Sequence, residues 1–177
     1  MTMKIYNKIR TFFKFPSVFK TRSPFYFGLL LIAANVYAAD SSNQPIKNDV
    51  YWVYSTEASF DEVKDNLVLA IEGKGAVISY TAHASDMLDR TAIDLKIKKK
   101  VYHKAEVLLF CKAELSHIMV KNNPHDLVLC PYPIAVYSLT SNPKITYLTI
   151  LAPPKGVSSY KAVHKLLTEI VAETIDF

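Results

Sequence analysis

The sequence contains none of the short motifs that mark common catalytic and metal sites. It has no Cys-x-x-Cys, no Cys-x-x-Cys-His and no His-Glu-x-x-His pattern, and no serine stands in a Gly-x-Ser-x-Gly turn. These absences argue against a covalently attached haem, a zinc-protease site and a serine hydrolase. Internal repeats and low-complexity segments are also absent, and 177 residues suit a single domain preceded by a processed segment.

Acidic residues are missing from the first 38 residues, which carry six of the 21 Lys and Arg side chains. Residues 39–177 contain the remaining 15 basic residues and all 16 acidic ones, so their net charge is −1, compared with +5 for the whole chain. The basic character therefore belongs to the N-terminal segment and not to a phosphate-binding surface. We expect no nucleic-acid partner.

This N-terminal segment has the pattern of a secretory signal peptide. An uncharged apolar run, residues 24–37, follows the basic stretch and leads to Ala38. Its 14 residues fall short of the roughly 20 that a membrane-spanning helix needs. We predict a signal peptide over residues 1–38, cleavage after Ala38, a periplasmic or secreted protein and no stable membrane insertion. An uncleaved signal anchor is the alternative.

The rest of the chain predicts a flexible linker over residues 39–49 and one domain over residues 50–177. A capping box at Ser59 and Glu62 marks the start of the first long helix, which Gly73 and Gly75 end. Another long helix follows Ser158 or Ser159, and shorter helices are expected within residues 83–95 and 113–121. The expected strands are residues 50–55, 76–81, 106–111, 131–139 and 145–151, the last two joined by a turn at 141–144.

This order predicts an α+β fold with two long and two short helices and a five-stranded, mostly antiparallel sheet. The strands are too unevenly spaced for a doubly wound parallel sheet. Most strands are apolar on both faces, so each face of the sheet needs a cover. The long helices can cover one face. The short helices, a partner subunit in a homodimer, or a ligand must cover the other.

A series of motifs adds a resemblance to a known family. The motifs are, in order, Phe60-x-x-Val63 with Leu67, Ile71 and Gly75, then His83-Ala84, residues 107–113, Pro124 and residues 130–137. In order and spacing they resemble the family called domain of unknown function 302, over residues 50–152, and within it an exported subgroup with cysteines. The resemblance implies a curved sheet in a TATA-binding-protein-like order of strand, helix, four strands and helix. It implies no established activity.

Cys111 and Cys130, the only cysteines, are expected to form a disulfide in an exported protein. With 18 residues between them, the bond would stabilise the fold by about 3 kcal/mol in the chain-entropy model. Two buried unpaired thiols are the alternative, because free cysteine is among the most buried residue types.

The same region predicts a second, competing kind of site. Cys111, His117, Met119, His125 and Cys130 lie within 20 residues and offer the ligands that copper(I) or an axial haem position prefers. The spacing argues against such a site, because Cys111 and His117 are off the three- or four-residue helical step. We therefore predict no cofactor, with copper or haem as the alternative.

His83 is the one further polar residue with a possible role. It follows an expected strand and precedes two aspartates, which would suit a general base, although a histidine at a strand end is more often structural. The sequence thus favours an exported, non-enzymatic domain that binds a small apolar ligand or a protein partner. The alternatives are a periplasmic metal or redox protein using Cys111 and Cys130, and a hydrolase or isomerase built around His83.

Overall fold

The computed structural model describes residues 44–176, and the predicted signal peptide with its cleavage position at Ala38 lies outside them. The elements in chain order are β1 (Ile46–Lys47), β2 (Tyr51–Thr56), α1 (Phe60–Gly73), β3 (Val77–Ala82), α2 (Ala84–Ala92), β4 (Tyr102–Cys111), α3 (Ala113–Asn122), the 3-10 helix η1 (Pro124–Leu129), β5 (Tyr132–Leu139), β6 (Asn142–Leu151) and α4 (Tyr160–Asp176).

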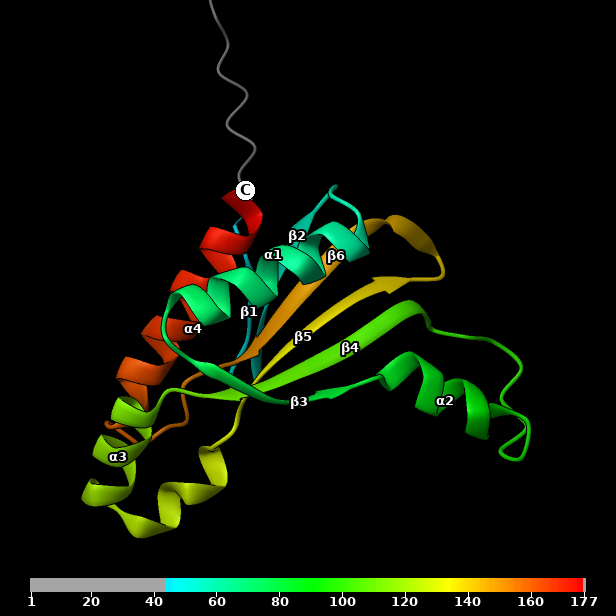
Figure 1. Cartoon of the computed structure of the whole chain (residues 1–177). Coiled ribbons are helices and arrows are strands. Elements are labelled where there is room, and N and C mark those ends of the chain that lie inside the picture. Colours follow the sequence, from blue (N-terminus) through cyan, green and yellow to red (C-terminus); the bar gives the residue numbers. More distant parts are fainter. Residues whose placement is uncertain (1–43, 177) are drawn as a thin grey trace, which may run out of the picture. The chain divides into compact units, whose positions relative to one another are not determined.

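The strands form one antiparallel sheet in the order β1-β2-β6-β5-β4-β3 (Figure 1). This confirms the predicted α+β class, with six strands in place of five. The additional strand, β1, falls within the segment predicted as a linker, residues 39–49. Its Lys47 stands opposite Trp52, and the Lys47 ammonium lies 4.0 Å from the centroid of the Trp52 ring. The segment thus joins the sheet through two paired residues, this cation–π contact and hydrogen bonds of Asn48, whose amide donates to the Tyr51 carbonyl oxygen at 3.1 Å.

Two strands begin earlier than the sequence pattern predicted. β4 starts at Tyr102, four residues before position 106, because its polar first half pairs with β5. β6 starts at Asn142, which pairs with Leu139, so the turn shrinks to two residues and the expected turn at 141–144 is wrong. Pro143 is tolerated there because the pairing of β6 with β2 reaches only to Thr146, so its missing N–H breaks no ladder.

One face of the sheet carries the hydrophobic core, which α1 and α4 cover (Figure 1). Leu67 and Ile71 of α1 and Leu167 of α4 are fully buried against strand residues such as Ile134. At the start of α1, the Ser59 hydroxyl accepts a hydrogen bond from the Glu62 amide at 3.3 Å, as the capping box predicted. Helix α3 and η1 close one end of this core, to which α3 contributes the fully buried Met119.

The opposite face of the sheet has no such cover within residues 44–176. Side chains that alternate with the core residues, such as Tyr137 and Thr149, are only partly buried. Of the short helices, α2 alone borders this face. It contacts β4 and buries none of its own residues. The apolar strand patterns predicted that this face would also be covered, but the described residues leave most of it uncovered.

Candidate functional site

The uncovered face holds a groove of about 470 Å³, which we call the face groove. It runs across the middle of the sheet, with α2 on one side. Its lining comes from β2, α2, β4, β5 and β6 and consists of Tyr51, Ala84, Leu88, Tyr102, Ala105, Glu106, Val107, Ala135, Tyr137 and Thr149.

The groove is hollow because small side chains meet in the middle of the sheet. Ala135 on β5 stands between Val107 on β4 and Thr149 on β6. Two residues before Val107 on β4, Ala105 stands opposite Tyr137. Side chains two residues apart share a face, so the two alanines leave a depression that larger neighbours surround.

Tyrosines form the rim of this depression. The Tyr137 ring meets Tyr102 edge-on with 5.5 Å between centroids, and it stacks on Tyr147 with 5.3 Å between centroids. The Tyr137 hydroxyl accepts a hydrogen bond from Thr149 Oγ1 at 3.3 Å. Burial raises the pKa of Tyr137, so its hydroxyl stays protonated at neutral pH and can donate to a bound group.

Ser85 of α2 makes two hydrogen bonds to the sheet beside this groove. Ser85 Oγ accepts from the Ala105 amide at 3.2 Å and donates to the Ala105 carbonyl oxygen at 3.4 Å. Leu88, one turn further along α2, lines the groove and is 45% exposed. Helix α2 therefore borders the groove, but few apolar contacts hold it against the sheet.

His83 lies at the N-terminus of α2, next to a buried carboxylate that the sequence did not point to. His83 Nδ1 is 3.3 Å from Glu106 Oε1, and Lys64 Nζ is 3.2 Å from the same oxygen. Glu106 Oε2 is buried and has no hydrogen-bond partner among the described residues. The pairing of Ala82 with Val107 brings His83 beside Glu106, so an exact β3–β4 register would have revealed the contact.

This cluster can hold and orient the His83 imidazole, which is what a general base requires. The His83 side chain is 60% exposed. The hydroxyl of Ser85, however, is already bonded to the backbone of Ala105, so it is not held for attack. A catalytic role for His83 stays a prediction.

The structure joins Cys111 and Cys130 in a disulfide, with 6.4 Å between their Cα atoms. The bond links the end of β4 to the residue two positions before β5. Ser116 Oγ lies 3.6 Å from Cys130 Sγ and 2.9 Å from the Tyr132 hydroxyl, so α3 is tied to the same corner. The predicted disulfide is therefore present.

The other members of the predicted soft-metal set are spread around this corner. His117 borders a surface pocket together with both cysteines, whereas Met119 lies in the hydrophobic core and His125 is exposed on η1. Across residues 44–176, no three His, Cys, Asp or Glu side chains are grouped so that they could hold a metal ion. The copper or haem alternative stays a prediction, and nothing in the arrangement adds to it.

The described residues form a small α+β domain with one antiparallel sheet, two long helices on one face and a groove on the other. The family model described as domain of unknown function DUF302 matches residues 52–175, and the chain belongs to this family. The predicted family is confirmed, and the match extends through α4. The exported, cysteine-containing subgroup stays a prediction.

A solved structure supports the fold. The crystal structure of an uncharacterized conserved protein DUF302 from Bacillus stearothermophilus superposes with a TM-score of 0.54 over 71% of this chain and 95% of that chain. The two sequences are 12% identical, so the likeness concerns the fold alone. The sequence matches none of the curated proteins with which it was compared. None of the helices within residues 44–176 is long and apolar enough to cross a membrane.

Proposed function

We propose that this protein is an exported, non-enzymatic binding domain whose face groove takes a small ligand with an apolar, planar body. The observation that carries this proposal is the depression over Ala105 and Ala135, rimmed by Tyr102 and Tyr137, on the sheet face that α1 and α4 leave free. Grooves with an apolar lining and a few placed polar groups are typical small-molecule sites.

The ligand lies flat on the alanine floor, with its edge against the tyrosine rings, since aromatic rings favour edge-to-face and offset contacts. The Tyr137 hydroxyl donates to one polar atom of the ligand and so sets its orientation. Helix α2 buries none of its residues, and displacing it exposes little apolar surface. We expect α2 to open and close the groove as the ligand enters.

Filling the floor of the groove tests this function. Ala135→Leu adds an isobutyl group where the ligand would lie, and Ala172→Leu adds the same group on the exposed side of α4. The probe is the fluorescent dye 1-anilinonaphthalene-8-sulfonate. We expect Ala135→Leu to weaken dye binding by about 10-fold, equivalent to about 1.4 kcal/mol, and Ala172→Leu to leave it unchanged.

Native mass spectrometry of protein purified from the periplasm provides the second readout. A retained small-molecule mass that Ala135→Leu removes supports the proposal. Equal dye binding by both variants contradicts it. A dimer that only Ala135→Leu disrupts also contradicts it, because the uncovered face would then be covered by a partner subunit.

Export is supported by the signal-peptide pattern of residues 1–38 and by the disulfide between Cys111 and Cys130, a bond typical of oxidising compartments. The expected result is a mature protein in the periplasmic fraction, with the mass of a chain that starts at Ala39. A full-length chain held in the membrane fraction would contradict cleavage and favour a signal anchor.

A further inference from the structure

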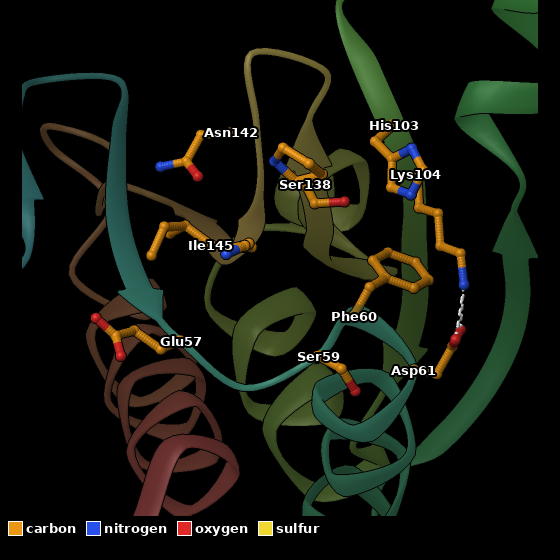
Figure 2. A pocket seen from close by; sticks show the side chains of 11 residues that line it. Glu57, Ser59, Phe60, Asp61, His103, Lys104, Ser138, Asn142 and Ile145 are labelled. Carbon is orange, nitrogen blue, oxygen red and sulfur yellow. Dashed lines mark hydrogen bonds and ion pairs between the residues drawn. The ribbon is translucent and has the colours of Figure 1, made fainter.

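A second groove lies at one end of the sheet, on the side of the core helices. It has a volume of about 580 Å³ and is bounded by the N-terminus of α1, the first residues of β4 and the β5–β6 turn (Figure 2). We call it the end groove. It shares no lining residue with the face groove, so the two are separate sites.

A hydroxyl without a partner lines the end groove. Ser138 on β5 is fully buried, and its Oγ has no hydrogen-bond partner among residues 44–176. Its cross-strand neighbour Thr146 is also buried, but Thr146 Oγ1 donates to the carbonyl oxygen of Ala58 at 2.8 Å. Figure 2 shows the Ser138 hydroxyl on the side of Phe60 and Lys104. A buried hydroxyl that lacks a partner is costly, so a ligand atom that supplies one binds with an advantage.

The side chains that line the end groove carry two positive and two negative charges, so its preference for an anion depends on the one lining lysine without an ion-pair partner among the described residues, Lys144, and on the start of α1. Lys104 is paired with Asp61 at 2.6 Å, whereas Lys144 and His103 line the groove and form no ion pair among the described residues. Glu57 also lines the groove and opposes an anion; in Figure 2 it lies across the groove from Lys104.

The first turn of α1 adds to the attraction. Only the Glu62 amide receives the Ser59 cap, so the amides of Phe60 and Asp61 remain at the positive end of the helix.

Two large apolar side chains, Phe60 and Ile145, also line the groove. Phe60 is 8% exposed and presents its ring to Lys104, whose ammonium lies 5.4 Å from the ring centroid. A free inorganic ion would leave this apolar surface uncovered, whereas an anion attached to a carbon body would cover it. One unpaired lysine matches a singly charged group better than a doubly charged one.

We propose that the end groove binds a small organic carboxylate. The carboxylate accepts a hydrogen bond from Ser138 Oγ and lies near Lys144 and the N-terminus of α1. The carbon body of the ligand rests on Phe60 and Ile145. This site is independent of the face groove and does not rest on the function proposed for that groove.

Titration with benzoate of the protein purified from the periplasm tests the charge requirement. Benzamide has the same ring without the charge, and inorganic phosphate has the charge without the ring. We expect benzoate to bind at least 10-fold more tightly than either compound. Phosphate that binds more tightly than benzoate, benzamide that binds equally well, or no benzoate binding at millimolar concentration would each overturn the proposal.

Two variants locate the site. Ser138→Ala should weaken benzoate binding at least 10-fold and raise the melting temperature of the ligand-free protein by a few degrees, because it removes an unpartnered hydroxyl. Lys144→Gln, an exposed change that leaves the core untouched, should weaken benzoate binding several-fold at low salt and leave benzamide unaffected. The matched control is Lys121→Gln on α3, which lies outside the groove. If Ser138→Ala or Lys144→Gln binds benzoate as the unaltered protein does, the end groove is not the site.

Discussion

His164 on α4 is a buried histidine whose ring meets Trp52 edge-on, with 4.4 Å between the ring centroids. Burial lowers the pKa of His164. The nearby backbone of Leu151 acts in the opposite direction and the positive charge of Lys47 in the same direction, and the net shift of the pKa is downward. When the pH falls below the ordinary histidine pKa of about 6.5, His164 therefore becomes protonated in the unfolded chain before it does so in the folded protein.

We expect the contribution of His164 to be complete above that value and to be lost as the pH falls through the lower pKa of the folded state. The melting temperature should decrease from pH 7.5 to pH 5, and this slope should be shallower for His164→Phe, which keeps a ring against Trp52. His117→Gln, at an exposed position on α3, is the control. Identical slopes for the unaltered protein and His164→Phe would show that His164 does not contribute.

Tyr160 and Tyr132 are both fully buried. Among residues 44–176, the Tyr132 hydroxyl has a partner, Ser116 at 2.9 Å, and the Tyr160 hydroxyl has none. Burial raises the pKa of Tyr160 to about 12, and nearby Tyr132 adds to this. We expect Tyr160→Phe to be neutral or slightly stabilising, because it removes an unpartnered hydroxyl. Tyr132→Phe should cost about 1 kcal/mol, because it breaks a hydrogen bond. Urea unfolding of the two variants measures this difference, and the opposite order would contradict it.

Among the elements, α3 and η1 depend most on the disulfide, since Cys111 and Cys130 stand on either side of them. We expect Cys111→Ser combined with Cys130→Ser to lower the free energy of unfolding by about 3 kcal/mol. Hydrogen exchange should accelerate first in residues 113–129, because the loop that they form is no longer closed. The unaltered protein in reducing agent is the control and should behave like the double variant. An unchanged free energy of unfolding in both cases would show that the disulfide does not stabilise the fold.

Helix α1 and strand β4 illustrate which elements local pattern can predict. The Ser59 cap and the apolar spacing of Val63, Leu67 and Ile71 are encoded in neighbouring residues, and α1 was predicted closely. The start of β4 was missed because His103 and Lys104 look like loop residues. They form a strand only because β5 supplies the hydrogen-bond partners.

For the molecule as a whole, all the core residues that the structure describes lie between residues 52 and 175. We expect a chain that starts at residue 44 to unfold in one cooperative transition, measured by circular dichroism and fluorescence together. A chain that starts at Tyr51 lacks β1 and the contact of Lys47 with Trp52. It should lose no more than about 1 kcal/mol, since an exposed cation–π contact is worth about that much. Failure of the longer chain to fold would contradict this assignment of the core.

The amino-acid order alone was enough to predict the α+β class, the family, both long helices and the cysteine pair. The helices depend on periodicity and caps within a few neighbouring residues. The family follows from the order of motifs along the chain, and the cysteine pair from there being only two cysteines in a chain with a signal-peptide pattern. The contact of His83 with Glu106, the depression over Ala105 and Ala135 and the unpartnered hydroxyl of Ser138 became visible only in the folded chain. Each depends on strand register and on which face the helices cover, and both are set by contacts between distant segments.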